Sequence, residues 1–357
     1  MPATYNILLM GASYGSLLAS KLLFGGHSIH LVCLPAEAEL INAEGFKVQL
    51  PIRGRKDPVL LESRKLPGKV TAGPAAGVDP KKYDLVGLCM QEPQYRLAGV
   101  RELLDAVGKS RVPCMSIMNM PPLPYIKRIP GLDYEALKPA YTDPGVWDSF
   151  DTACITLNSP DPQAIRPPDQ KVNFLLVTLP TNFKCAKFDD EKKTAIVRQL
   201  EKDVEAARFD APDGKIELPV KLKVYDSIFV PLAKWAMLCA GNYRCVTKDG
   251  MRTAQEAVHS DIETSRAVYN FVNDLCVTLG AKPLDLVPFE KYAAAAQSLT
   301  RPASAARALQ NGAPFIERAD KLVQLIAKQK RLSHPVLDAT VALVDARLDA
   351  NRKKQAA

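Results

Sequence analysis

The first 34 residues constrain the fold most strongly, because they have the pattern of a strand, a tight turn, a helix and a second strand. Residues 5–10 form a continuous apolar run that is typical of a buried parallel strand. The turn Gly11-Ala12-Ser13-Tyr14-Gly15-Ser16 follows, and apolar residues at 17–24 and 30–34 predict the helix and the next strand. Such a unit at the start of a chain indicates a Rossmann-type dinucleotide-binding domain.

Length and apolar spacing predict two domains. The 357 residues exceed the size at which a single core usually stops growing. Apolar runs predict further strands at 83–90, 112–118, 153–157 and 171–179, whereas helical spacing dominates later, at 189–207, 227–241, 253–280, 303–310, 316–330 and 334–351. We therefore expect an α/β fold with a Rossmann-type domain at 1–185 and an all-α domain at 186–357.

Composition and charge patterning argue against several classes of partner. No run of about 18 apolar residues exists, so we expect no membrane span, and the start lacks a basic leader, which favours the cytoplasm. The net charge of +8 is scattered without aromatic interleaving, which argues against nucleic acid and favours small anionic ligands. The eight cysteines never form a CxxC pair, so we expect buried thiols in a reducing compartment and no metal site.

The glycine-containing turn is the first candidate site. Backbone N–H groups at the start of a helix lack intrahelical partners and can hold a pyrophosphate, so Gly11, Ala12, Ser13, Tyr14 and Gly15 are the expected cofactor-binding residues. The turn reads GxxxG, whereas the dinucleotide fingerprint reads GxGxxG, and a plain tight turn is the alternative interpretation. Its position inside a strand-turn-helix-strand unit favours the cofactor.

The residues after the second predicted strand bear on the choice between NADP and NAD. Dinucleotide enzymes carry an acid there for the ribose hydroxyls or a base for a 2′-phosphate. This sequence reads Val32-Cys33-Leu34-Pro35 and offers neither. We therefore expect either cofactor to bind with weak discrimination, and Arg53, Arg55 and Lys56 are the candidates should discrimination prove strong.

The second candidate site is Lys234, which lies in a predicted helix that is apolar nearly all round. A lysine in such a helix either extends its ammonium to the surface or holds a functional ammonium. Asn242 follows eight positions later, about two helical turns along the same side. Since Leu232, Trp235 and Leu238 leave little polar surface near Lys234, the pattern favours a functional role.

Several segments together resemble the ketopantoate reductases, over almost the whole chain. The opening residues that carry the resemblance are Ile7–Ala12, Gly25-Gly26-His27 and Ile41–Phe46. Further along, the resemblance rests on Asp84-Leu85-Val86, Gln94, Asn119, Lys234 with Asn242, Ser304 and Gln310–Pro314. Each motif is modest, and their shared order is what makes the resemblance specific.

The resemblance implies roles for these residues. Lys234 would be the general acid that protonates the carbonyl oxygen as hydride arrives, with Asn119 and Asn242 beside it. Asn119 and Gln94 would also contact the cofactor, and Asn242 and Ser304 would line the substrate site. From the residues alone, Asn119 is equally a turn residue and Ser304 a helix cap. By analogy, the helical domain would form a homodimer.

This sequence departs from the family at several of these positions. Gln91 stands where the family has lysine, and Leu238 replaces a second asparagine. The family glutamate falls on Ile316, with Glu317 one position away and so rotated by about 100° on the predicted helix. Glu317 is nevertheless included among the expected substrate-binding residues. The more apolar lining favours a bulkier or less hydrophilic substrate than ketopantoate.

These observations favour an NAD(P)-dependent oxidoreductase that acts on a small or medium carbonyl or hydroxyl compound, anionic in character. Two rival interpretations stay open. In one, Lys234 serves proton transfer or carbon–carbon cleavage without net redox change. In the other, the fold is kept by a non-catalytic binding protein.

Overall fold

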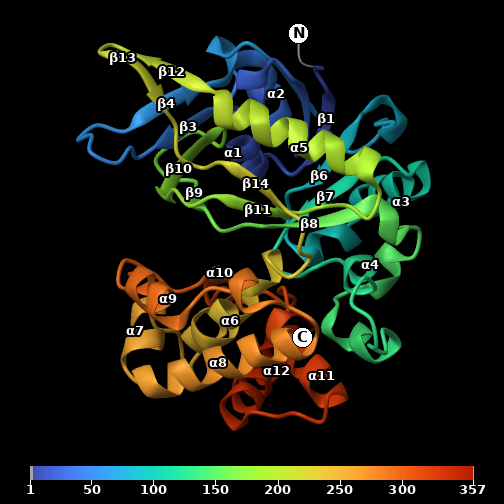
Figure 1. Ribbon diagram of the computed structural model, residues 1–357, viewed down its shortest axis with the longest axis vertical. Coiled ribbons are helices and arrows are strands. Elements are labelled where there is room, and N and C mark those ends of the chain that lie inside the picture. The colour runs from blue at the N-terminus through green and yellow to red at the C-terminus, as the bar shows by residue number, and fades with distance from the viewer. Residues whose placement is uncertain (1–2, 357) are drawn as a thin grey trace. The chain divides into compact units, whose positions relative to one another are not determined.

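The computed structural model describes residues 3–356, whose contacts divide the chain into two compact units. Unit 1 comprises the chain up to Met90, together with Gln94–Met118 and Val146–Asp226. Unit 2 comprises Gln91–Pro93, Asn119–Gly145 and the chain from Ser227 onward. Figure 1 shows that the strands belong to the first unit and that the second is built from helices.

Unit 1 is organised around an eight-stranded sheet with the order β14-β11-β8-β7-β6-β1-β2-β5. All neighbouring strands pair in parallel except β11 and β8, which are antiparallel. The strands span Asn6–Met10 (β1), Ser28–Val32 (β2), Lys69–Gly73 (β5), Leu85–Leu88 (β6), Cys114–Ile117 (β7), Ile155–Ser159 (β8), Phe183–Ala186 (β11) and Leu222–Tyr225 (β14). The central strands β1, β6 and β7 are apolar and almost completely buried, as expected where helices cover both faces of a sheet.

Two smaller sheets and four helices complete unit 1. The order β4-β3-β10-β9 joins Val59–Glu62, Lys47–Leu50, Phe174–Leu179 and Gln163–Ile165, while β12 (Arg208–Ala211) and β13 (Gly214–Glu217) form a hairpin. The helices are α1 (Ala12–Leu22), α2 (Pro35–Glu44), α3 (Val100–Ser110) and α5 (Glu191–Ala206). Helices α1 and α5 pack against each other, and α5 also contacts β14 (Figure 1).

The division between the units differs from the expected boundary near residue 186. Helix α5 packs on unit 1 and β14 adds to the edge of its large sheet, so the chain up to Asp226 belongs with the Rossmann-type half. Strand β10, expected to end that half, lies in the second sheet and is followed by four more strands. Residues 119–145, between two strands of unit 1, belong to unit 2, which the sequence pattern did not indicate.

Unit 2 confirms the all-α expectation for the C-terminal part. Its helices are α4 (Leu123–Ile126), α6 (Lys234–Met237), α7 (Ala254–His259), α8 (Ile262–Thr278), α9 (Phe289–Ala296), α10 (Ser304–Gln310), α11 (Ala319–Gln329) and α12 (Pro335–Ala356). A π-helical turn, Leu238–Asn242, continues α6. The predicted helix 253–280 is two helices, because Asp261 caps a new start by accepting a hydrogen bond from the Thr264 N–H.

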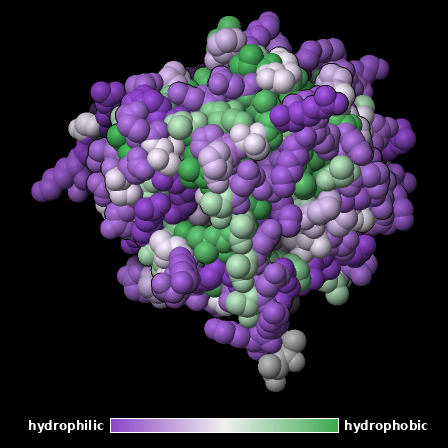
Figure 2. All heavy atoms as spheres, turned by 90° about the horizontal axis from the view of Figure 1, so that it is seen from below, coloured by the Kyte–Doolittle hydropathy of each residue, from purple (hydrophilic) through white to green (hydrophobic). Residues whose placement is uncertain are grey.

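No helix among residues 3–356 has the length and apolarity needed to cross a membrane. Hydrophilic side chains cover most of the face drawn in Figure 2, and hydrophobic atoms form a smaller central area on it.

Candidate active site

The glycine turn of unit 1 is made by Gly11 alone, and helix α1 begins at the next residue. Gly11 has a φ of 109°, which favours glycine, and its N–H donates to Val32 O over 2.8 Å. The first N–H groups of α1 lack both a side-chain cap and an acidic residue in the first turn. The helix therefore starts five residues earlier than expected, and its N-terminal N–H groups follow β1 directly.

The expected cofactor-binding residues occupy different environments on this first turn. Ser13 is exposed, whereas Ala12 and Gly15 are buried, and a Cβ at Gly15 would make ordinary contacts with Cys89. The Tyr14 hydroxyl donates to Pro162 O over 2.6 Å, and burial raises the pKa of that phenol well above its usual range. Tyr14 thus secures the loop before β9, which leaves Ser13 as the accessible side chain.

The end of β2 carries an ion pair that sequence reasoning missed. Arg166, just after β9, pairs with Glu37 in the first turn of α2. Burial and the Glu37 charge raise the pKa of the Cys33 thiol that follows β2, whereas the Arg166 charge lowers it. Arg55, one of the expected basic candidates, instead pairs with Asp213 at 2.8 Å.

Gln94, the other expected cofactor residue of unit 1, is exposed on a 3₁₀ turn, Glu92–Arg96, that follows β6.

Unit 2 contains a pocket that gathers most of the other expected residues. Its lining is polar on one part and apolar on another, and consists of Gln91, Asn119, Leu238, Asn242, Tyr243, Ser304, Ala305, Ile316 and Glu317. All of these residues belong to unit 2. The structure therefore places Asn119, Asn242, Ser304 and Glu317 together, from segments that are up to 198 residues apart in sequence.

Glu317 is the buried carboxyl of this pocket and is 6% exposed. Asn119 Nδ2 donates to its Oε2 over 3.0 Å, and the Met120 N–H donates to Oε1 over 3.4 Å. Burial raises the pKa of the Glu317 carboxyl, while these hydrogen bonds and the positive charge of Lys234 oppose the rise. Glu317 and Lys234 are therefore electrostatic partners within unit 2.

The expected 100° rotation of Glu317 away from the site is wrong. Helix α11 begins at Ala319, so Ile316 and Glu317 lie in the non-helical segment before the helix, and both line the pocket. Tyr243 holds this segment, because its hydroxyl donates to Glu317 O over 2.6 Å and accepts from the Ala319 N–H over 2.9 Å. Tyr243 and Glu317 are residues whose joint placement the sequence could not indicate.

Lys234 opens α6 and is half-buried between fully buried neighbours. Trp235 and Leu238 are 1% and 3% exposed, as the apolar pattern predicted. Asn242 follows in the π-helical turn and lines the pocket beside Leu238. Leu238 and Ile316, at positions where the resemblance to the ketopantoate reductases implies polar residues, form the apolar part of the lining together with Ala305.

Ser304 is not a helix cap. Ala303 occupies the N-cap position of α10, makes no side-chain cap, and leaves Ser304 as the first helical residue. Its side chain lines the pocket. The alternative structural interpretation of Ser304 is therefore corrected.

Glu92 is a second buried carboxyl near this pocket, and the sequence pattern gave no sign of it. It is 2% exposed and accepts hydrogen bonds from Thr142 N–H at 3.0 Å and Thr142 Oγ1 at 2.8 Å. Its own N–H lies 3.5 Å from Glu317 Oε1. Burial raises the pKa of Glu92 to about 7, and the Glu317 charge adds to the rise.

Each of the two units holds hydrogen-bonding groups that a ligand could meet. Among the described residues, Oδ1 of Asn119 is buried without a hydrogen-bond partner, although its Nδ2 is paired. An unpaired buried acceptor is costly unless a ligand donates to it. In unit 1, the N–H groups at the start of α1 offer donors to a pyrophosphate.

Comparisons with known proteins identify the fold. No family model matches the sequence, and no curated protein matches it. D-mandelate dehydrogenase, solved with NADH and anilino(oxo)acetate, is 14% identical with a TM-score of 0.62, covering 97% of this chain and 99% of that chain. A 2-dehydropantoate 2-reductase from Methylococcus capsulatus is 13% identical with a TM-score of 0.63, covering 97% of each chain. A ketopantoate reductase from Ralstonia eutropha JMP134 is 14% identical with a TM-score of 0.59, covering 97% of this chain and 99% of that chain.

Identities this low indicate a shared fold rather than a shared activity. The chain therefore has the fold of the ketopantoate reductases, on which its sequence is strongly diverged.

Proposed function

We propose that the protein is an NAD(P)-dependent oxidoreductase that interconverts a carbonyl and a hydroxyl group on a small or medium substrate. The observation that carries the proposal is the pocket of unit 2. Its lining combines the Glu317 carboxyl with the amides of Asn119 and Asn242, and the positive charge of Lys234 lowers the pKa of that carboxyl. Hydride addition to a carbonyl creates an alkoxide, which needs a proton and a cation close by.

We propose a 2-oxo acid or 2-hydroxy acid as the substrate class. The solved proteins with this fold are named for mandelate and for 2-dehydropantoate, both of which carry a carboxylate next to the reacting carbon. Leu238 and Ile316 supply apolar lining, which suits a substrate with an apolar side chain. The net charge of +8 also favours an anionic substrate.

We propose roles in this reaction for Lys234 and for four of the residues that line the pocket. Lys234 donates the proton to the alkoxide oxygen, and Glu317 stabilises the Lys234 ammonium before transfer. Asn242 and Ser304 hold the polar groups of the substrate, and Glu317 can accept from a substrate hydroxyl. Asn119 offers its unpaired Oδ1 to a donor on the nicotinamide or the substrate.

The proposed cofactor site is the Gly11 to Gly15 turn of unit 1, with Gln94 as a further contact. The N–H groups at the start of α1 would hold the pyrophosphate, and Ser13 is exposed beside them. When bound, a reduced nicotinamide supplies the hydride. NADP and NAD are both candidates.

We further propose that the protein works as a homodimer in the cytoplasm. A dimeric ketopantoate reductase from Staphylococcus aureus has this fold, with 8% identity and a TM-score of 0.58.

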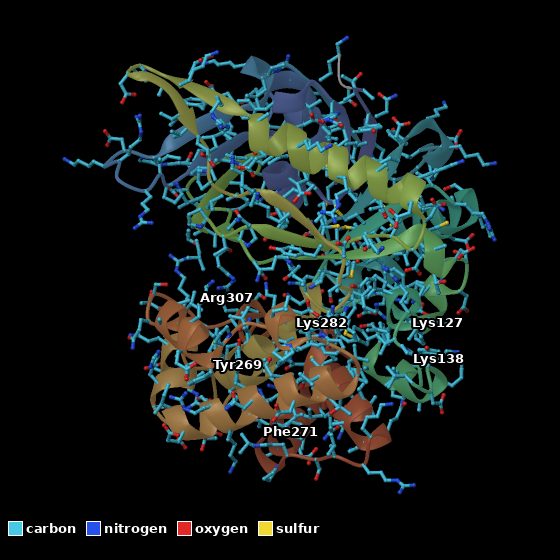
Figure 3. All side chains as sticks on the ribbon, in the orientation of Figure 1. Lys127, Lys138, Tyr269, Phe271, Lys282 and Arg307 are labelled. Atoms are coloured by element: carbon cyan, nitrogen blue, oxygen red, sulfur yellow. The ribbon has the colours of Figure 1, made fainter. Side chains whose placement is uncertain are left out.

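The first experiment titrates the protein with NADH and NADPH and follows nicotinamide fluorescence, then assays cofactor oxidation with 2-dehydropantoate and with phenylglyoxylate, the oxidised form of mandelate. Lys234→Met should leave dinucleotide affinity unchanged and lower turnover by about 10² to 10⁴, the range of a positioned acid-base group. Lys282→Met, at a solvent-facing lysine of unit 2 labelled in Figure 3, is the matched control and should keep full turnover.

Full turnover in Lys234→Met would remove the acid role. Absence of dinucleotide binding in the unaltered protein would favour the non-redox lysine enzyme or the binding protein instead.

A further inference from the structure

The helix that carries Lys234 changes its winding inside the pocket wall. It runs as α6 through Met237 and then as a π-helical turn, Leu238–Asn242, in which the Tyr243 N–H donates to Leu238 O five residues earlier. Single π turns occur mostly within α-helices and often at functional sites. Here the turn begins four residues after Lys234 and ends at Asn242.

The altered winding decides which side chains share a face. On an α-helix, residues five positions apart point about 140° away from each other. A turn closed by hydrogen bonds over five residues reduces that angle to about 50°. Leu238 and Tyr243 are five positions apart, and both line the pocket together with Asn242. The π turn therefore accounts for how Tyr243 faces the same pocket as Leu238.

A tyrosine from another helix occupies the space beside this turn. The Tyr292 hydroxyl, from α9, donates to Met237 O over 3.1 Å. An α-helix would instead use that carbonyl for the N–H of residue 241. A Cβ at Gly241 would collide with the same hydroxyl and press on Val258 Cγ2 at 3.2 Å. Gly241 thus makes room for the hydroxyl that holds Met237 O.

A second side chain contacts the middle of the turn. Arg244 is 8% exposed and donates from Nη1 to Ala240 O over 3.1 Å. Side chains thus donate to Met237 O, just before the π turn, and to Ala240 O, inside it. Gly241 and Tyr292 depend on each other, because a side chain at position 241 would overlap the Tyr292 hydroxyl.

We propose that Tyr292 and Gly241 are positioning residues that lock the π turn and thereby hold Asn242 and Tyr243 in the pocket wall. The lock also reaches Glu317, because the Tyr243 hydroxyl fixes the backbone at Glu317 and Ala319. Neither Tyr292 nor Gly241 lines the pocket, so both act through the residues that do. The catalytic consequence rests on the proposed function of the pocket.

The test compares two buried tyrosines of unit 2 that stack on each other at 5.3 Å between ring centroids. Tyr269 (Figure 3) comes from α8, and its hydroxyl donates to Val287 O over 2.9 Å, away from the π turn. Tyr292→Phe and Tyr269→Phe should each lower Tm by about 2–4 °C for one lost hydrogen bond. Tyr292→Phe alone should lower kcat/KM by about 10 to 10²-fold, with unchanged dinucleotide affinity.

The double variant separates stability from positioning. Gly241→Ala should unfold at a clearly lower temperature because its methyl group collides with the Tyr292 hydroxyl. Adding Tyr292→Phe removes the collision and should recover part of Tm, yet kcat/KM should stay at or below that of Tyr292→Phe. Recovery of kcat/KM together with Tm would overturn the proposal.

Hydrogen exchange of the backbone amides at 241–243 tests the lock without any substrate. Exchange should be faster in Tyr292→Phe than in Tyr269→Phe, and equal exchange in the two variants would overturn the lock. Unchanged turnover in Lys234→Met would instead contradict the proposed function. The hydrogen-exchange measurement would then still test whether Tyr292 stabilises the π turn.

Discussion

Ser13 is the residue at which the proposed cofactor site is most open to test. It lies in the first turn of α1 and is exposed, whereas Gly15 is buried against Cys89. An aspartate at Gly15 would bury a charge and so disturb the fold itself. An aspartate at Ser13 stays in water, and it interacts favourably with the helix dipole while repelling a pyrophosphate.

Ser13→Asp should therefore keep or raise Tm and weaken NADH and NADPH binding by about ten- to thirtyfold, equivalent to about 1.4–2 kcal/mol of charge repulsion. Ser13→Asn is the neutral control of the same size and should bind both cofactors nearly normally. Fluorescence titrations of the three proteins decide the matter, and equal affinities across them would exclude this turn as the pyrophosphate site.

For single residues, the sequence predicted which side chains line the pocket better than it predicted how each of them is placed there. Asn119, Asn242 and Ser304 do line one pocket, and Glu317 joins them although helical periodicity pointed it elsewhere. Periodicity assumes a regular helix, and residues 316–318 precede one. Glu92 and Thr142 carry no local motif, because their contact depends on the fold of residues 119–145.

The contact between β9 and α2 matters at the scale of elements, because it brings a charge pair to the end of β2. Dinucleotide folds place the adenosine ribose at that strand end. Arg166 would favour a 2′-phosphate and Glu37 would accept from ribose hydroxyls, and the two form an ion pair. Because these two charges oppose each other, we continue to expect weak discrimination between NADPH and NADH.

We predict that the ratio of NADPH to NADH affinity stays within about a hundredfold and moves in opposite directions in two variants. Arg166→Gln should shift the ratio about tenfold toward NADH, and Glu37→Gln about tenfold toward NADPH, each a change of about 1.4 kcal/mol. Arg55→Gln is the control, since Arg55 pairs with Asp213. A shift in Arg55→Gln with none in Arg166→Gln would assign the discrimination to the β3–β4 turn.

Elements were predictable where apolar runs or caps mark them. Strands β1, β2, β6 and β7 and helix α5 fall close to their predicted ranges. The π turn was not predictable, because its cause is a hydroxyl from α9 that meets Gly241 only in the folded chain. The sequence also did not predict that residues 119–145 belong to unit 2, because contacts in the folded chain, and not composition, define that unit.

For the molecule as a whole, each unit buries one ionisable group whose pKa moves to about 7, and the two have opposite effects on stability. In unit 1, Lys21 is 2% exposed, donates to Pro219 O over 2.6 Å, and has its pKa lowered to about 7 by burial and the nearby Lys221 charge. The unfolded chain then binds more protons between pH 7 and about 10.5, so stability rises with pH in that window. In unit 2, burial raises the pKa of Glu92 to about 7, so the folded state binds more protons between about pH 4.5 and 7, and stability falls as pH rises through that window.

The two tryptophans allow the units to be followed separately, because Trp147 lies in unit 1 and Trp235 in unit 2, both buried. Urea unfolding of Trp235→Phe should show stability that rises from pH 7 to 10, and unfolding of Trp147→Phe should show stability that falls from pH 5 to 7.

Adding Lys21→Met should abolish the first trend and raise the unfolding free energy at pH 7 by about 2 kcal/mol. Removing the pKa shift contributes a gain of about 4 kcal/mol, and losing the hydrogen bond to Pro219 O costs about 2 kcal/mol. Glu92→Gln should flatten the second trend and leave the first unchanged. Identical pH dependence at both tryptophans in all variants would mean that the units unfold as one cooperative body, in which case neither group could be assigned to its own unit.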